Sequence, residues 1–179
     1  VSYGYDGLDR LTSTTATNLG IISAGYDALG RRTSLVDSVG TTSFGYDSLG
    51  RMTGLTAPNT GSVSYGYDGL GRRTQITYPG TGAPVLTYSY FPDSQLREVV
   101  QSGSTLASYA YDPVGRLAQV TRLGGTASIT NYQYDRADRT VAVRSTTNGT
   151  LVSNFQYQLD RLGLRNTVTE TLPANPTPS

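Results

Sequence analysis

The sequence predicts an all-β fold, built as tandem antiparallel β-hairpin repeats that form a curved, solenoid-like or spiral sheet. Three observations predict it. A Tyr-Asp motif recurs along the whole chain, and internal repeats of about 20–50 residues are typical of stacked, repetitive folds. Fourteen Tyr, together with frequent Val, Ile and Thr, suit a pleated and half-buried surface. The apolar stripe at i, i+3 and i+4 that indicates an amphipathic helix is missing.

The repeat is the string Tyr-Asp-x-Leu-Gly-Arg, which occurs in about eight copies with a period of 20–23 residues. Two copies have Asp in place of Gly, and two others are degenerate. We assign structural roles in the motif to Tyr5, Asp6, Arg10, Tyr26, Asp27, Gly30, Arg31, Tyr46, Asp47, Gly50, Arg51, Tyr67, Asp68, Gly71, Arg72, Tyr90, Arg97, Tyr111, Asp112, Gly115, Arg116, Tyr134, Asp135, Arg139, Tyr157 and Arg161.

Each copy predicts one hairpin. In the strand before the motif, Val63, Tyr65 and Tyr67 share one face, because side chains alternate between faces with a period of two. The motif Asp then opens the turn, where its carboxylate can accept hydrogen bonds from local backbone N–H groups. The Gly or Asp before Arg takes the left-handed conformation that closes a short loop. The returning strand begins at the Arg.

The connections between hairpins are marked by Gly, Pro and Asn, as in residues 18–20, 59–61, 79–82 and 148–149. The hairpin tips carry an apolar residue where a turn facing solvent would prefer a polar one. This residue predicts that each tip packs against its neighbour, since an isolated hairpin is only marginally stable in water. The apolar tip residues are Leu8, Leu29, Leu49, Leu70 and Val114.

The charges are balanced, because the fourteen basic residues, all Arg, face thirteen acidic ones and leave a net charge of +1. No strong field therefore attracts nucleic acid or an anionic membrane. Arg carries a planar fork that binds carboxylates, so we expect the Asp and Arg of one motif to bond across or beside their own loop. Codon preference in a GC-rich genome is the alternative explanation for the absence of Lys. A calcium ladder is less favoured, since the Gly-rich nonapeptides of calcium-binding β-rolls are missing.

The chain contains neither Cys nor His, which excludes disulfides, thiolate metal sites and Ser–His or Cys–His catalysis within it. Two carboxylates could still hydrolyse a glycoside, but the motif Asp is one turn residue copied many times. We therefore predict no enzyme, no catalytic or metal-binding residues and no cofactor. The Tyr rows are interpreted as packing, with carbohydrate contact as an alternative. No apolar run is long enough to insert into a membrane, and we expect no signal peptide at Val1.

The motif Tyr-Asp-x-x-Gly-Arg, with a period near 21, resembles the YD-repeat family, which includes bacterial Rhs proteins, over residues 1–168. Related arrays occur in toxin-complex cage proteins, bacterial wall-associated proteins and teneurins. The resemblance implies a long sheet of hairpins wound into a hollow shell, which encloses a toxin in bacterial members and serves adhesion in teneurins. This chain has fewer repeats than a complete cage. Asp112-Pro113 begins the string that ends Rhs cores but continues as an ordinary repeat.

We therefore predict a hairpin-repeat array over residues 1–168, followed by a Pro-rich tail or linker over 169–179. The predicted function is a non-catalytic structural scaffold, a segment or subunit of a β-sheet shell, wall or filament of Rhs/YD type, and a toxin or effector encoded elsewhere is the cargo that such a scaffold could enclose or display. The alternative is a carbohydrate- or cell-surface-binding adhesion module. The expected partners are further YD repeats of a parent chain or neighbouring copies, which meet at exposed sheet edges, and the alternative adds glycans or a cell-surface partner. The expected location is extracellular or on the cell surface, with no binding of nucleic acid and no membrane insertion.

Overall fold

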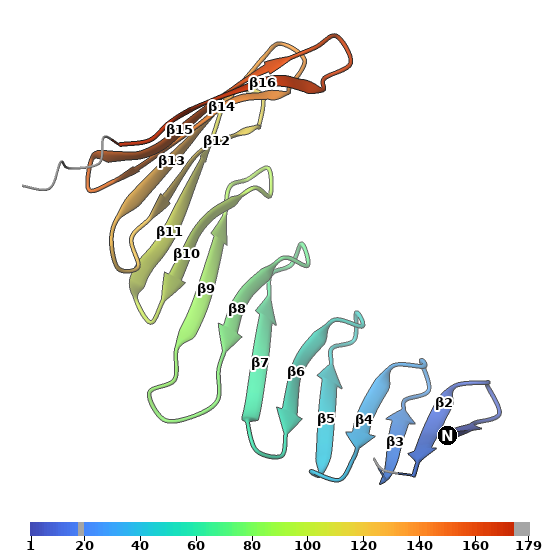
Figure 1. Cartoon of the computed structure of the whole chain (residues 1–179). Helices are drawn as coiled ribbons and strands as arrows, with labels where there is room; N and C mark the ends of the chain where they lie inside the picture. Colours follow the sequence, from blue (N-terminus) through green and yellow to red (C-terminus); the bar gives the residue numbers. More distant parts are fainter. Residues whose placement is uncertain (18–19, 174–179) are drawn as a thin grey trace, which may run out of the picture. The chain divides into compact units, whose positions relative to one another are not determined.

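The computed structural model describes residues 1–17 and 20–173, and it confirms the all-β prediction. Sixteen strands form a single sheet whose strand order follows the chain from β1 to β16 (Figure 1). Every neighbouring pair whose register is known is antiparallel, so the array consists of consecutive hairpins. The described residues contain no helix that could cross a membrane. Contacts divide the chain into two units, Val1–Leu86 and Thr87–Ser179.

The first unit contains hairpins one to four. Its strands are β1 (Ser2–Tyr5), β2 (Leu11–Ala16), β3 (Gly20–Tyr26), β4 (Arg32–Val36), β5 (Thr41–Tyr46), β6 (Met52–Ala57), β7 (Gly61–Tyr67) and β8 (Arg73–Thr77). The register shifts just before the Tyr that precedes each tip, as between Gly45 and Tyr46. The returning strand therefore carries one extra residue, which is a β-bulge.

The second unit contains hairpins five to eight. Its strands are β9 (Val85–Tyr90), β10 (Leu96–Gln101), β11 (Ser104–Tyr111), β12 (Leu117–Arg122), β13 (Ser128–Tyr134), β14 (Thr140–Thr147), β15 (Thr150–Leu159) and β16 (Arg165–Thr171). The first two residues of β9 belong to the preceding unit. The predicted tail overlaps β16 at residues 169–171, and its residues 174–179 lie outside the described part of the chain.

The buried core is thin. Among the described residues, the only buried apolar side chains are Ile76, Val120 and Ala142. Tyr3 and Tyr5 are about 60 % exposed, while the tip-proximal Tyr of later hairpins, such as Tyr46 and Tyr67, are half-buried. A sheet of one layer covers its side chains mainly with neighbours from the next strands. Stability therefore has to come from contacts along the sheet as much as from burial.

The loops at the two ends of the strands differ in regularity. All eight hairpin tips span five residues, from 6–10 to 160–164. The connections between hairpins vary instead from two residues, Ser102 and Gly103, to seven residues over 78–84. One loop length is thus repeated at the tips, whereas the connections between hairpins have no common length.

The prediction that apolar tip residues pack against the neighbouring hairpin is wrong. Leu8, Leu29, Leu49, Leu70 and Val114 are 71–75 % exposed. The tips lie one hairpin apart, which is roughly 10 Å at the usual strand spacing, and the side chain at the third loop position does not bridge that gap. Adjacent hairpins are joined by other residues of the motif.

Candidate functional site

The hairpin tip is closed by backbone and carboxylate hydrogen bonds, as the second copy shows. The Asp27 N–H donates to the Arg31 carbonyl at 2.9 Å, and the Gly30 N–H donates to the Asp27 carbonyl at 3.0 Å. The Asp27 carboxylate accepts the N–H groups of Leu29 and Arg31, both at 2.9 Å. Gly30 has a φ of 79°, the left-handed conformation predicted for this slot. Asp9 and Asp138 take the same conformation in the copies without Gly.

The motif Arg binds the carboxylate of its own loop. In the third copy, Arg51 Nε donates to Asp47 Oδ2 at 2.7 Å, with both side chains partly exposed. This pair confirms the predicted bond between the Asp and Arg of one motif. It occurs in six of the eight tips, as Asp6–Arg10, Asp27–Arg31, Asp47–Arg51, Asp68–Arg72, Asp112–Arg116 and Asp135–Arg139.

The same Arg also reaches the next hairpin, a role that the sequence did not predict. Arg51 Nη1 donates to the Asp68 carbonyl at 3.2 Å, and the guanidinium lies 4.6 Å from the ring centre of Tyr67. Five Arg side chains donate to the Asp carbonyl of the following tip: Arg10, Arg31, Arg51, Arg116 and Arg139. Four of them lie over the Tyr of that tip, on Tyr26, Tyr46, Tyr67 and Tyr134.

The Tyr completes the link in the opposite direction. The Tyr67 hydroxyl donates to the Met52 carbonyl at 2.8 Å, at the start of the returning strand of the preceding hairpin. The hydroxyls of Tyr26, Tyr46, Tyr111 and Tyr134 make the equivalent bond. Tyr, Asp and Arg thus form an inter-hairpin ladder, in which five guanidinium groups join their own carboxylate to the next carbonyl and four of these also lie over the next ring.

These bonds hold the motif carboxylates in the charged form. Hydrogen bonds from the Arg backbone N–H and guanidinium lower the pKa of Asp6, Asp27, Asp47 and Asp135 below 3.8. Burial acts in the other direction and is the largest influence at Asp68 and Asp112, but hydrogen bonds from their Arg partners still lower the pKa. These Asp side chains are therefore acceptors within the ladder and are poorly suited to act as general acids.

The fifth hairpin replaces the ion pair by aromatic and amide contacts. Phe91 occupies the Asp position, because its N–H donates to the Gln95 carbonyl, and Ser94 takes the left-handed slot. Gln95 occupies the Arg position and donates from Nε2 to the Gly115 carbonyl of the next tip at 2.6 Å. Phe91 meets Tyr111 edge to face, with ring centres 6.0 Å apart. The Arg assigned from the sequence, Arg97, lies two residues beyond this position.

The last hairpin also differs from the prediction. Asp160 closes the loop with Leu164, so Leu164 stands where six of the other tips have Arg. Arg161 is the second residue of this tip, and Tyr157 lies three residues before Asp160, with Leu159 in the usual Tyr position. The string Asp160-Arg161-Leu162-Gly163 carries the Asp-x-Leu-Gly spacing that could have located this tip. Leu159 precedes Asp160 where other copies have Tyr, so the Tyr-Asp pair that marks the repeat is absent here.

The described residues contain no group of three or more Asp or Glu side chains that could hold a metal ion. The motif residues direct their functional groups at one another and at the backbone of adjacent hairpins. These contacts hold neighbouring repeats together.

Comparison with known proteins agrees with this geometry. The family model described as RHS Repeat matches residues 26–62 and, overlapping them, residues 46–83. No curated protein matches the chain. The crystal structure of TcdB2-TccC3-Cdc42 superposes with a TM-score of 0.70 and 19 % identity, over 90 % of this chain and 10 % of that one.

The Tc holotoxin pore of Photorhabdus luminescens gives a TM-score of 0.55 and 14 % identity, over 97 % of this chain and 12 % of that one. At these identities the likeness shows the fold alone, and the chain spans about a tenth of each solved chain. The family match covers the second, third and fourth tips, each of which carries an Asp–Arg pair within its loop. Residues 26–83, about a third of the chain, therefore match the RHS Repeat model, which confirms the family resemblance predicted from the Tyr-Asp motifs.

Proposed function

We propose that this chain is a non-catalytic structural scaffold, a segment or subunit of an Rhs-type β-sheet shell, wall or filament. The observation that carries the proposal is the inter-hairpin ladder. It uses the side chains that recur in the sequence, and within each unit its hydrogen bonds join neighbouring hairpins. A chain of nearest-neighbour links of this kind suits an extended array, because each repeat is stabilised by the repeats beside it.

Within this proposal, a toxin or effector encoded elsewhere is enclosed or displayed, and the protein acts outside the cell or at its surface. The support is the likeness in fold to solved Tc toxin structures and the Rhs-repeat match. The partners are further Rhs hairpins, contributed by a longer chain or by other copies. They pair with the backbone N–H and C=O groups of the edge strands β1 and β16, which a sheet edge leaves free.

Sedimentation velocity over a range of concentrations, combined with hydrogen exchange, tests the proposal on the full chain. Partner-completed edges predict association with rising concentration, and slower exchange at β1 and β16 in the associated state. A monomer at all concentrations whose β1 and β16 amides are already protected would overturn the edge pairing. Replacement of Arg31 and Arg51 by Ala should lower the free energy of unfolding of the array. It should not alter the turnover of any substrate, because the proposed role is non-catalytic. Turnover of a substrate that is lost with a single Asp→Asn replacement would overturn the non-catalytic role.

A further inference from the structure

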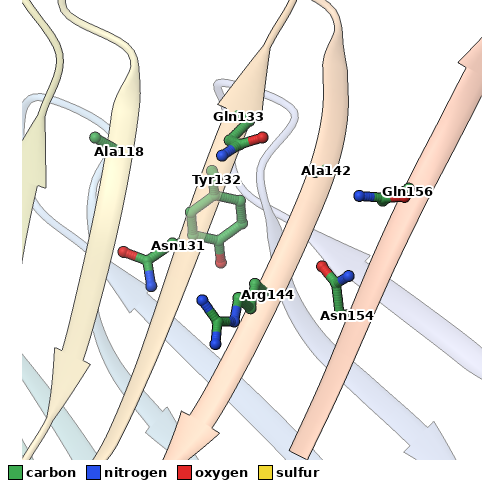
Figure 2. Close-up of a pocket in the computed structure, with 8 residues that line it drawn as sticks. All are labelled: Ala118, Asn131, Tyr132, Gln133, Ala142, Arg144, Asn154 and Gln156. Carbon is green, nitrogen blue, oxygen red and sulfur yellow. The ribbon is translucent and has the colours of Figure 1, made fainter. Parts of the chain in front are cut away.

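A polar cavity of about 630 Å³ lies on the face of β13, β14 and β15 in the second unit. Four amide side chains and one guanidinium line it, contributed by Asn131, Gln133, Arg144, Asn154 and Gln156. Figure 2 shows these side chains on neighbouring strands around the position of Ala142. None of the described residues that line the cavity is acidic.

The strand register fixes the arrangement of these groups. Asn131, Arg144 and Asn154 stand directly opposite one another on β13, β14 and β15. Gln133, Ala142 and Gln156 form a parallel row two residues along the same strands. With usual strand dimensions, the four amides mark the corners of a rectangle of roughly 10 Å by 7 Å. The small Ala142 lies at the middle of one long side, and Arg144 lies at the middle of the other.

The repeat itself does not require these residues. The six equivalent positions of the third and fourth hairpins, aligned through their registers, hold only small residues: Ser43, Gly45, Gly54, Thr56, Ser62 and Ser64. Thr56 and Ser62, which correspond to Arg144 and Asn154, bond each other at 2.7 Å. The same face of the sheet therefore carries short side chains there and long amides here. The cavity is a local feature added to a common framework.

The lining groups remain free to bind a ligand. Gln133, Arg144 and Gln156 are exposed. Asn131 accepts a hydrogen bond from Gln119 Nε2 at 2.8 Å, which leaves its own N–H groups for another partner. Arg144 forms no ion pair among the described residues, in contrast to the six motif Arg that bind an Asp. An unpaired guanidinium among amides is a donor set suited to an oxyanion.

We propose that this cavity binds an anionic saccharide, with Arg144 on a carboxylate or sulfate and the four amides on ring hydroxyls. A side-chain amide offers a donor and an acceptor side by side, and a sugar hydroxyl can serve as either. An extended polypeptide fits less well. It would require apolar recesses for alternate side chains or a free strand edge, and β13, β14 and β15 are each paired on both sides. The site does not depend on the scaffold role.

The test titrates the full, isotope-labelled chain with a panel of glycans that carry uronate, sialate or sulfate, each with its neutral counterpart. We expect at least one anionic member to shift the amide resonances of Asn131, Gln133, Asn154 and Gln156, and to bind more tightly than its neutral counterpart. Arg144→Gln should weaken that binding about tenfold, the equivalent of ~1.4 kcal/mol. Arg136→Gln, which removes an exposed Arg from a hairpin tip, is the matched control and should leave the affinity unchanged.

Three results would overturn the inference. The first is an absence of binding across the panel. The second is equal loss of affinity in Arg144→Gln and Arg136→Gln, which would indicate attraction to net charge and not to this cavity. The third is perturbation of the cavity resonances only by an unfolded protein such as carboxymethylated casein, which would assign the cavity to polypeptides. Unchanged circular dichroism of both variants ensures that a loss of binding does not reflect unfolding.

Discussion

Replacement of Arg51 by Lys tests the inter-hairpin ladder at a position where three contacts meet. Lys keeps the positive charge and can still approach Asp47. It carries a single terminal nitrogen, so it cannot bind Asp47, reach the Asp68 carbonyl and cover the Tyr67 ring at the same time. The substitution therefore separates the geometry of the guanidinium from its charge.

The magnitude follows from the contacts that Lys gives up. One hydrogen bond to a backbone carbonyl contributes about 1 kcal/mol net. The partly exposed contact between guanidinium and ring contributes about 0.5 kcal/mol. We exclude the pairing with Asp47, since Lys can retain it. Arg51→Lys should therefore lower the free energy of unfolding by roughly 1–1.5 kcal/mol.

Urea unfolding followed by circular dichroism measures this change, with Arg136→Lys as the control. Arg136 is exposed at a hairpin tip, and its replacement should alter stability by less than about 0.5 kcal/mol. Tyr67→Phe isolates one contact further, because it removes only the hydroxyl bond to the Met52 carbonyl and should cost about 1 kcal/mol. Equal unfolding midpoints for Arg51→Lys and Arg136→Lys would refute the ladder as a source of stability.

Three further outcomes follow from the same geometry. Gly50→Ala should destabilise by about 1 kcal/mol, because Gly50 has a φ of +80°, whereas Gly7→Ala should be neutral; thermal melts compare them, and equal melting temperatures would argue against the left-handed requirement. Leu49→Ser should change stability by less than about 0.5 kcal/mol in the same assay, since Leu49 is 75 % exposed, and a large loss would restore the idea of packed tips. The motif Asp carboxylates have a lowered pKa when folded, so their contribution is present above pH 3.8 and is lost as the pH falls below it. Urea midpoints between pH 7 and 2 check this, and Asp47→Asn should respond less steeply to acid.

The repeating part of the fold could be predicted from the sequence, because its cause is local. The Asp-x-Leu-Gly spacing sets both the carboxylate bonds and the left-handed residue within one loop, and both lie within five residues of chain. The tips at Asp27 and Asp47 therefore appear as predicted. The bond between Asp and Arg of one motif was predictable for the same reason.

The contacts between hairpins could not be predicted in this way. Arg51 meets Tyr67 because strand pairing brings together residues that are sixteen positions apart, and the sequence does not give that register. The apolar character of Leu49 predicts burial, whereas the side chain is exposed. In a sheet of one layer, no second layer lies over the tip to cover it. The tips of the degenerate copies could not be placed for a different reason, because an amide side chain (Gln95) and an aliphatic one (Leu164) occupy the position of the motif Arg.

The contrast between the uniform tips and the variable connections has a consequence for insertions into the chain. A tip of five residues leaves no room for insertion, because each added residue would move an Arg away from both its carboxylate and the next ring. The connections carry no such requirement, and the segment from Tyr78 to Pro84 is already the longest of them. Foreign peptides, tags or natural insertions should therefore be accepted within residues 79–83 and rejected within residues 48–50. Related sequences should therefore differ in length at the connections between hairpins and keep the length of the tips constant.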